Sequence, residues 1–271
     1  MRIWMLGSGS RGNAVLVECG ESRLLIDCGF SPTELARRLE ATGTAPECIE
    51  ALIVTHEHAD HARGVAAASR RWGWDVYAST GTVAADASLA EIGVHTFDAG
   101  ATLSFTHVEL RTVRCSHDAA EPVALIATSV ASGARAGIAY DLGMMTGNVR
   151  DAFTHLDLLV LEANHDDLML REGPYPIFVQ RRIAGRSGHL SNAASAEAAR
   201  ECVHRHLHDV VLAHISEQCN TPVLALKAVG AALTRTRFRG RLTAARQDGV
   251  VGPFDVHSST LRPSTQLAFD I

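Results

Sequence analysis

The sequence contains no segment suited to enter a membrane. No apolar run reaches the roughly 20 residues that a membrane-spanning helix needs. The first residues, MRIWMLGSGSRG, lack the basic stretch and long apolar stretch that together mark a signal peptide. We therefore expect a protein of the cytoplasm that does not bind membranes.

The sequence also lacks cysteines in closely spaced pairs. Its 6 cysteines form no C-x-x-C pair and follow no regular spacing. They do not outline a disulfide framework, and we interpret them as reduced thiols of the core or of loops in a reducing compartment.

An excess of basic residues is absent as well. The formal net charge is -5, so any contact with nucleic acid has to come from a local basic patch. No linker rich in Gly, Ser or Pro divides the 271 residues, and no short repeat occurs. With 46% hydrophobic residues, the chain can bury a sizeable core. We predict a single domain over residues 1–271.

Apolar runs alternate with helical patterns along the chain, which is typical of an α/β fold. The expected strands cover 2–6, 14–19, 23–28, 51–55, 75–79, 123–129, 134–141, 156–163 and 209–216. The expected helices cover 31–43, 61–73 and 192–207. The first of these helices has the clearest ends, with Ser31 as N-cap, Glu34 completing a capping box and Gly43 as its end.

The densest group of polar side chains directly follows the apolar run ALIVT. The group consists of His56, His58, Asp60 and His61. In an extended segment, residues two apart point to the same side, so His56 and His58 would face one cavity. Imidazole and carboxylate groups suit zinc, manganese or iron, and two sets of ligands suit two ions. The alternative is a solvated polar loop at the end of a strand.

One loop cannot complete two metal sites, so further ligands are expected at the ends of other strands. His117, Asp141 and His214 each lie where an apolar strand leaves the core. Seven other histidines lie in polar or helical surroundings, and we interpret them as surface or packing residues: His95, His107, His155, His204, His206, His208 and His257. The cluster HRHLH among them is expected to be helical and solvated.

The glycine-rich segment GSGSRGN is expected to be a tight connection between two strands. It is not a phosphate-binding Walker loop, because it lacks the Gly-Lys-Ser/Thr sequence. Its backbone amides could still lie along the rim of the site.

A series of motifs resembles one known superfamily. GSGSRGN, LLIDCG, VTHEHADHARGV, SHDAAEPV, LEANHDDLML, RRI, GHLSN and LAHISEQCN occur in this order. They resemble the metallo-β-lactamase fold superfamily and, within it, the bacterial YycJ/WalJ-like branch related to ribonuclease Z. The resemblance runs from about Met1 to beyond Pro222. It implies an α/β fold of the αββα four-layer sandwich type, with metals at one edge of the two sheets.

The resemblance also implies a set of ligands for two divalent ions, Zn²⁺ or Mn²⁺. His56, His58 and His117 would bind one ion. Asp60, His61 and His214 would bind the other, and Asp141 would bridge both. Asp27 would support the histidine loop from behind by bonding to its backbone.

Two further residues acquire catalytic roles from the resemblance. His189 in GHLSN would approach the scissile phosphate, and Glu162 would orient it; together with Asp60 they form the predicted catalytic set. The alternative for Glu162 is a structural carboxylate at a strand end. The alternative for His189 is a residue that only leads into a helix.

The resemblance implies a metal-dependent nuclease, with 5′-to-3′ DNA exonuclease activity and a link to DNA repair. Arg181, Arg182 and Arg186 form the best local basic cluster for a nucleic-acid backbone, with a solvated charge run as the alternative. Gln180 stands where related chains commonly carry lysine, which weakens the expected phosphate contacts. DNA is favoured over RNA as the partner, and the oligomeric state stays open. The alternative functions are a small-molecule hydrolase, such as a thioesterase or a cyclic phosphodiesterase, and a non-hydrolytic metal-binding protein.

Overall fold

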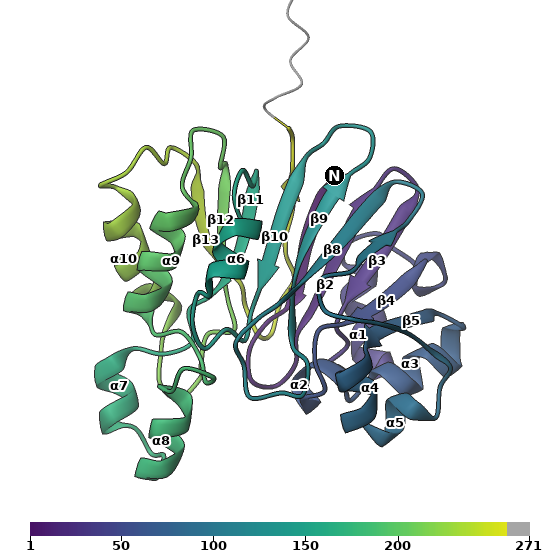
Figure 1. The fold of residues 1–271 in the computed structure, drawn as a ribbon, viewed down its shortest axis with the longest axis horizontal. Helices are drawn as coiled ribbons and strands as arrows, with labels where there is room; N and C mark the ends of the chain where they lie inside the picture. The colour runs from purple at the N-terminus through teal and green to yellow at the C-terminus, as the bar shows by residue number, and fades with distance from the viewer. Residues whose placement is uncertain (259–271) are drawn as a thin grey trace, which may run out of the picture.

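Two seven-stranded sheets pack face to face in the computed structural model, which describes residues 1–258 (Figure 1). In sheet order, the first contains β14 (Val251–Asp255), β1 (Arg2–Gly7), β2 (Ala14–Cys19), β3 (Ser22–Ile26), β4 (Ala51–Val54), β5 (Asp75–Ser79) and β6 (Val94–Phe97). The second contains β13 (Arg241–Ala244), β12 (Asp209–Ala213), β11 (Leu158–Glu162), β10 (Arg135–Ala139), β9 (Val123–Ser129), β8 (Val108–Arg114) and β7 (Thr102–Ser104).

Helices cover the outer face of each sheet. The first sheet is covered by α1 (Pro32–Glu40), α3 (Val65–Trp72), α4 (Thr80–Ala85) and α5 (Ala87–Ala90), with a 3₁₀ turn at Pro46–Cys48, and α2 (Ala59–Ala62) lies at the lower edge in Figure 1. The second is covered by α6 (Gly147–Ala152), α9 (Asn192–Cys202) and α10 (Pro222–Leu233). The hairpin of α7 (Asp167–Glu172) and α8 (Ile177–Ile183) projects below α9 in Figure 1. No helix in the described range is long and apolar enough to cross a membrane.

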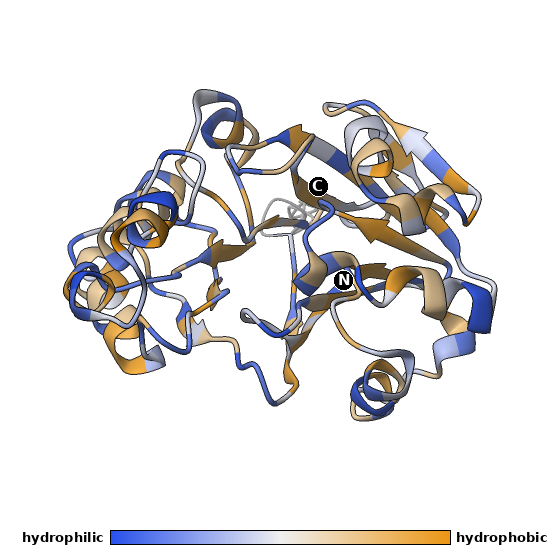
Figure 2. Ribbon diagram, turned by 90° about the horizontal axis from the view of Figure 1, so that it is seen from below, coloured by the Kyte–Doolittle hydropathy of each residue, from blue (hydrophilic) through white to orange (hydrophobic). Residues whose placement is uncertain are grey.

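The strands are apolar on both faces because each face is covered. Leu24 and Ile26 of β3 point into the core between the sheets, whereas Leu25 points into the core beneath α1 and α3. In the same way, Leu158 of β11 points inward and Leu159 points toward α9 and α10. The sheets accordingly form the hydrophobic interior in Figure 2. This alternation produces the predicted four layers, so the predicted fold class is confirmed.

The strand predictions are confirmed, with ends that differ by one or a few residues. Five strands were not predicted from the sequence: β6, β7, β8, β13 and β14. Four of these, all but β8, lie at sheet edges, and β6, β7 and β13 have few buried side chains, so they lack a clear apolar signal. The predicted domain boundary at residue 271 lies outside the described residues.

The helix at 31–43 is shorter than predicted, and its capping box is only half formed. Ser31 accepts a bond from the backbone N–H of Glu34, as expected of an N-cap. The carboxylate of Glu34, however, accepts bonds from Arg37 and Arg38 instead of turning back to Ser31. The helix ends at Glu40, before Gly43.

The predicted helix at 61–73 is interrupted, forming α2 and α3. The carbonyl of Asp60, which a continuous helix would bond to Gly64, instead accepts the N–H of Asn13 at 2.8 Å. The N–H of Gly64 donates to Cys28 O at 2.9 Å. Neighbouring loops thus take over the backbone groups of this turn, a tertiary effect that local sequence does not reveal.

The predicted helix at 192–207 ends at Cys202, so the prediction of a helical, solvated HRHLH cluster is wrong. Val203 is extended. The side chain of His204 is half-buried and donates from Nε2 to Leu156 O at 2.7 Å. This bond to the loop before β11 fixes the segment as a loop.

Strand direction places the functional side chains at one edge. β3, β4, β5 and β6 run parallel, as do β10, β11, β12 and β13. The loops that follow β3, β4, β10, β11 and β12 therefore leave the two sheets at the same edge, where ligand sites of such sheets commonly lie.

Candidate metal centre

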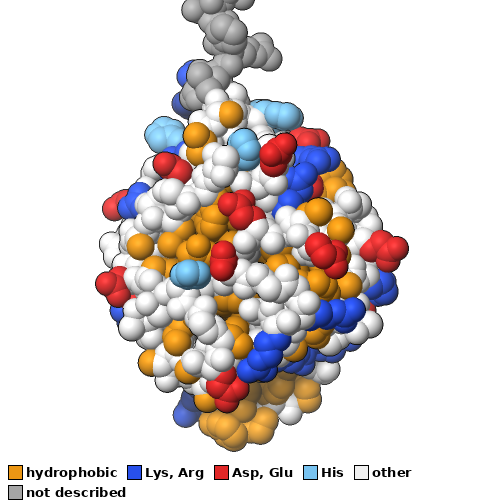
Figure 3. Space-filling view, turned by 90° about the vertical axis from the view of Figure 1, so that its right-hand side faces the viewer, with side chains coloured by type: hydrophobic (Ala, Val, Ile, Leu, Met, Phe, Trp, Pro, Cys, Tyr) orange, Lys and Arg blue, Asp and Glu red, His pale blue; other side chains and the backbone are white. Residues whose placement is uncertain are grey.

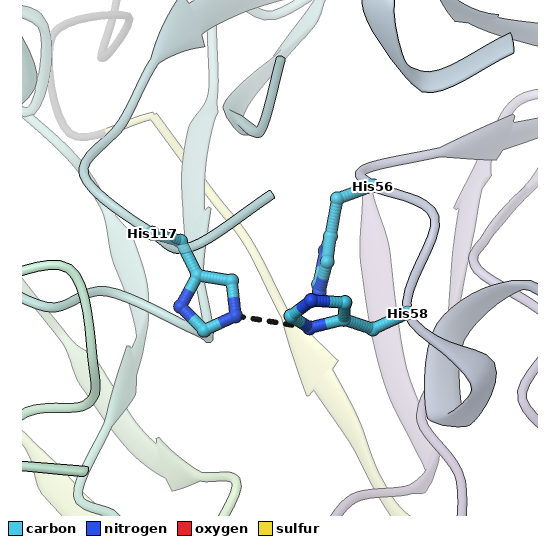
Figure 4. A group of neighbouring side chains, drawn as sticks. All are labelled: His56, His58 and His117. Carbon is cyan, nitrogen blue, oxygen red and sulfur yellow. Dashed lines mark hydrogen bonds between the residues drawn. The ribbon is translucent and has the colours of Figure 1, made fainter. Parts of the chain in front are cut away.

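The first group of candidate ligands joins the loop after β4 to the loop after β8. His56 and His58 extend from the β4 loop, with ring centroids 4.7 Å apart, and His117 faces His58 from the other side (Figure 4). His117 Nε2 lies 3.2 Å from His58 Nδ1. The other nitrogen of His117, Nδ1, donates to Gly188 O at 2.9 Å, which leaves Nε2 free to bind an ion.

The second group consists of Asp60, His61, Asp141 and His214, whose ligand atoms lie within 4.8 Å of one another. His214 Nε2 lies 3.1 Å from Asp60 Oδ2, and His61 Nε2 lies 3.4 Å from the same oxygen. Asp141 lies between the two groups, because its Oδ2 is 3.4 Å from His56 Nε2 and also contacts His61 Nε2. This position is the one that a bridging carboxylate requires.

Asp27 fixes the histidine loop in two ways. It accepts the backbone N–H and the hydroxyl of Thr55, both at 2.7 Å, and the ring Nδ1–H of His61, also at 2.7 Å. The first pair of bonds matches the expected support of the loop backbone. The bond to His61 was not predicted, and it directs the Nε2 of that ring toward Asp60 and Asp141.

The backbone at the site adopts an uncommon conformation. Four described residues other than glycine have positive φ, and three of them belong to the centre: Asp27 (60°), Asp141 (64°) and His214 (51°). Each follows the end of a strand, so the left-handed turn aims its side chain across the sheet edge. Such conformations persist where the surroundings enforce them, and they are concentrated at functional sites.

The donor atoms fit metal ions on two grounds. First, His56 Nε2 is fully buried and has no hydrogen-bond partner among residues 1–258, while its Nδ1 is 3.0 Å from Thr55 Oγ1. Burying a ring nitrogen that has no hydrogen-bond partner costs free energy unless a bound ligand satisfies that nitrogen. Second, burial lowers the pKa of His56 well below its usual value, and His61 adds to this effect. The ring is therefore neutral, as a ligand must be.

The negative charge of the buried carboxylates also has to be balanced by cations. Burial acts to lower the pKa of His61, but Asp141, Asp27 and Asp60 outweigh it and raise that pKa well above its usual value. Burial acts to raise the pKa of Asp60, but His61 and His214 hold it well below its usual value. Without metal, protons on the imidazoles must balance this negative charge, and divalent ions balance it in their place.

Glu162 and His189 adjoin the second group. Glu162 is fully buried, and its Oε2 accepts the N–H groups of Leu142 and Leu190 at 2.8 and 2.9 Å. Its Oε1 accepts the Nδ1–H of His189 at 2.7 Å. His189 lies in the loop two residues before the N-cap Ser191, so it precedes the helix instead of opening it. Glu162 thus ties the β10 end to the GHLSN loop and holds the His189 ring.

Sequence reasoning missed several residues of the site. Asn13 Nδ2 lies 3.2 Å from Asp60 Oδ2 and 3.1 Å from His61 Nε2, so the GSGSRGN loop is more than a strand connection. Asn164 donates to His214 O at 3.0 Å, and His165 is buried with its Nδ1 unpartnered. The order E-x-N-H directly after a predicted strand was the available signal for these two.

The centre opens into a cavity of about 340 Å³. Its lining includes His58, Asp60, Asp141, His189, His214, Tyr175 and Arg182. Of the three predicted arginines, only Arg182 lines this cavity, where its Nε donates to Asp118 at 2.5 Å. Arg181 and Arg186 are exposed outside the cavity lining. Asp118, directly after His117, was not singled out from the sequence.

Comparison with known proteins agrees with this geometry. The Beta-lactamase superfamily domain matches residues 22–238, which include every strand-end residue of the centre. The chain belongs to the metallo-β-lactamase superfamily. Together with the histidine and aspartate clusters, which are consistent with a dinuclear metal site, this membership identifies a metal-dependent hydrolase.

Two bacterial proteins named as exodeoxyribonucleases align with most of this chain. The "Exodeoxyribonuclease WalJ" of Streptococcus pneumoniae is 31% identical over 227 residues, covering 82% of this chain and 84% of the relative. The "Exodeoxyribonuclease YycJ" of Bacillus anthracis is 28% identical over 269 residues, covering 98% and 97%. The metallo-β-lactamase fold protein YhfI of Bacillus subtilis superposes with a TM-score of 0.71 at 15% identity, covering 93% of this chain and 99% of that one, which supports the fold alone.

Proposed function

We propose that this metallo-β-lactamase superfamily member is a dinuclear metal-dependent phosphodiesterase that digests DNA from its 5′ end. The observation that carries the proposal is the position of Asp141 between two histidine groups at the floor of an open cavity. The two relatives named as exodeoxyribonucleases support DNA as the substrate. A link to DNA repair and a cytoplasmic location belong to the same proposal.

The proposal gives each ligand a role. One ion is held by His56, His58 and His117, and the other by Asp60, His61 and His214. Asp141 contributes to both sites. Two such ions, Zn²⁺ or Mn²⁺, lower the pKa of bound water and neutralise charge on a phosphodiester. Asp60, which also faces the cavity, would in addition accept a hydrogen bond from the attacking water.

His189 acts on the leaving group in this proposal. Its Nδ1–H is committed to Glu162, so the other ring nitrogen, Nε2, is available to substrate. Burial acts to lower the pKa of His189, but the carboxylates of Glu162 and Asp141 together outweigh it and raise the pKa to about 9. The ring therefore carries a proton near neutral pH and can donate it to the departing oxygen. Glu162 is a positioning residue, since it reaches the reaction only through His189.

A small phosphodiester is the second candidate substrate. A cavity of about 340 Å³ is at the lower end of the range for sites that enclose small ligands, roughly 300–1,000 Å³. A cyclic phosphodiesterase would need no contact beyond this cavity. A polymeric substrate, in contrast, needs the surface around the rim.

One digestion experiment tests the proposal. Single- and double-stranded DNA and RNA, each labelled at the 5′ or the 3′ end, are incubated with protein that has been stripped of metal and reloaded with Zn²⁺ or Mn²⁺. We expect early release of the 5′ label as a mononucleotide from DNA and slower digestion of RNA. Cleavage of only a small cyclic phosphodiester would favour the second candidate. No hydrolysis by fully loaded protein would favour a non-hydrolytic metal-binding protein.

We also propose that both sheets belong to one domain. A single cluster of buried side chains draws on both, for example Ile3 and Val17 from the first sheet and Leu125 and Val160 from the second. Such a shared core favours cooperative unfolding. A thermal melt followed by two probes should give one coincident transition, and two separate transitions would contradict the proposal.

A further inference from the structure

Exposed apolar side chains are concentrated on the α7–α8 hairpin. Five large apolar side chains are markedly exposed within residues 1–258, and three of them belong to this hairpin: Leu168 (52%), Ile177 (62%) and Phe178 (71%). In Figure 1, α8 is the lowest part of the molecule, and the lower edge of the molecule is hydrophobic in Figure 3. Exposed aromatic side chains at the rim of a site commonly mark a binding surface.

The hairpin is continuous with the cavity. Tyr175, directly before the N-cap of α8, and Arg182 and Ile183, at its end, line the cavity. Phe178 lies three residues after Tyr175 and four before Arg182, so it shares a helix face with Arg182, about 6 Å away along the axis. Arg181, the residue directly before Arg182, is exposed. Helix α8 carries these two arginines and no carboxylate.

We propose that α8 is a stacking platform for the single-stranded end of the substrate. Phe178 stacks on one base, while Arg181 pairs with a backbone phosphate beside it. Tyr175 contacts the nucleotide nearer the metal centre. The inference rests on the proposed nuclease function and adds the form of the substrate: an unpaired end, because the faces of paired bases are covered by their neighbours in a duplex.

Charge favours DNA over a second copy of this chain as the occupant of the hairpin. In a symmetric dimer the same surface meets itself, so Arg181 and Arg182 would approach their own equivalents across an apolar contact. This repulsion applies where α8 meets α8, since Arg182 pairs with the carboxylate of Asp118 and the exposed carboxylates of the hairpin, Asp167 and Glu172, lie on α7. A phosphate backbone, in contrast, is complementary to both the charge and the exposed aromatic ring.

The test compares four variants on three substrates. Phe178→Ala removes the ring, Phe178→Leu keeps an apolar side chain without a flat face, and Phe178→Trp enlarges the face. Val130→Ala is the matched control, because Val130 is also exposed (58%) but follows the end of β9 that points away from the site. The substrates are a single-stranded 20-mer, the blunt duplex of the same sequence, and bis(4-nitrophenyl) phosphate.

We expect Phe178→Ala to raise KM for the single strand by about 5- to 150-fold, the range for loss of one stacked base. Phe178→Leu should resemble Phe178→Ala, Phe178→Trp should match the wild type or bind more tightly, and Val130→Ala should match the wild type. The loss on the single strand should exceed the loss on bis(4-nitrophenyl) phosphate at least fivefold. Melting temperatures check that each variant is folded.

Three results would overturn the inference. An unchanged KM in Phe178→Ala, or full function in Phe178→Leu, would exclude stacking. A concentration-dependent dimer in sedimentation that Phe178→Ala dissolves would assign the hairpin to self-association. The proposed function has a separate test. If the wild-type protein does not digest DNA, both the nuclease function and the platform are refuted. If it digests DNA equally well with and without the Phe178 ring, only the platform is refuted.

Discussion

The metal centre and the α7–α8 hairpin are adjacent, yet they are built in opposite ways. Asp27 and Glu162 are buried and accept several hydrogen bonds each from strand ends and loops, and the buried Asp141 contacts His56, His61 and His214. On the hairpin, Phe178 and Arg181 are exposed to solvent. In our proposal, the buried centre sets the chemistry, and the exposed hairpin sets which substrate reaches it.

The largest effect should come from breaking the centre at the residue that both groups share. Asp141→Ala should weaken both ions, since Asp141 adjoins His56 and His61 on one oxygen and His214 on the other. Mutation of a residue that only orients a metal ligand typically lowers metal affinity by roughly 10- to 100-fold. We expect a larger loss of metal affinity for Asp141→Ala, and activity near background. Metal analysis after dialysis measures how many ions the variant retains. Asp75→Ala, at an exposed aspartate of β5, is the control. A full metal complement in the Asp141 variant would remove its bridging role.

The next largest effect separates catalysis from metal binding. His189→Ala should lower the single-turnover rate by about 10²–10⁴-fold, the usual contribution of a positioned acid or base. Metal content and substrate affinity should change much less, because this interaction strengthens mainly in the transition state. Loss of one ion would instead make His189 a ligand, which its place in a third group with Asp141, Glu162 and His214 allows for.

Glu162→Gln should show a smaller loss in the same direction. The amide keeps the shape of the side chain but removes the charge that holds the His189 proton. The same preparations and rate measurement serve for this variant. A larger loss than that of His189→Ala would show that Glu162 matters mainly through its bonds to Leu142 and Leu190.

The pH–rate profile should carry the signature of His189. The proton-donating ring is present below its pKa, about 9 without metal, and is lost as the pH rises through that value. Ions bound to Asp141 would weaken the attraction between this carboxylate and the His189 proton. The activity should therefore begin to fall at or below about pH 9, by about tenfold per pH unit. At acid pH, activity should fall as the ligand histidines bind protons in place of metal. An alkaline limb that persists in His189→Ala would assign it to another group.

The smallest effect should come from the rim. Replacing Arg181, Arg182 and Arg186 with alanine should weaken single-stranded DNA binding and reduce the salt slope by up to about 2, because each phosphate that is no longer neutralised lowers the slope by about 0.7. Because Arg182 already pairs with Asp118, most of the change should come from the other two. Alanines at Arg37, Arg70 and Arg71 on the outer helices remove the same charge far from the cavity and serve as control. Equal slopes in both triple variants would return the three arginines to a solvated surface.

The sequence determined the centre of this protein because its ligands follow buried strands. His56, His58, Asp60 and His61 are local to one loop, and runs of apolar residues announce the strands that carry Asp141 and His214. Parallel strands in a layered fold end at one edge, so the pattern predicted alternating strands and helices with these residues at strand ends, whereas the four-layer αββα arrangement followed from the resemblance to the family. Glu162 and His189 depended on the motifs of the family, and the structure brings their atoms within 2.7 Å.

Only the tertiary structure decided which loops close around that edge. Asn13 reaches Asp60 because the GSGSRGN loop takes the backbone carbonyl of Asp60, a contact between residues 47 positions apart. The split of α2 from α3 and the loop at His204 have the same cause, bonds to distant segments of the backbone. The exposure of Phe178 depends on how the hairpin projects from α9. Such contacts are non-local and leave no periodic pattern, so they become visible only when the chain is folded.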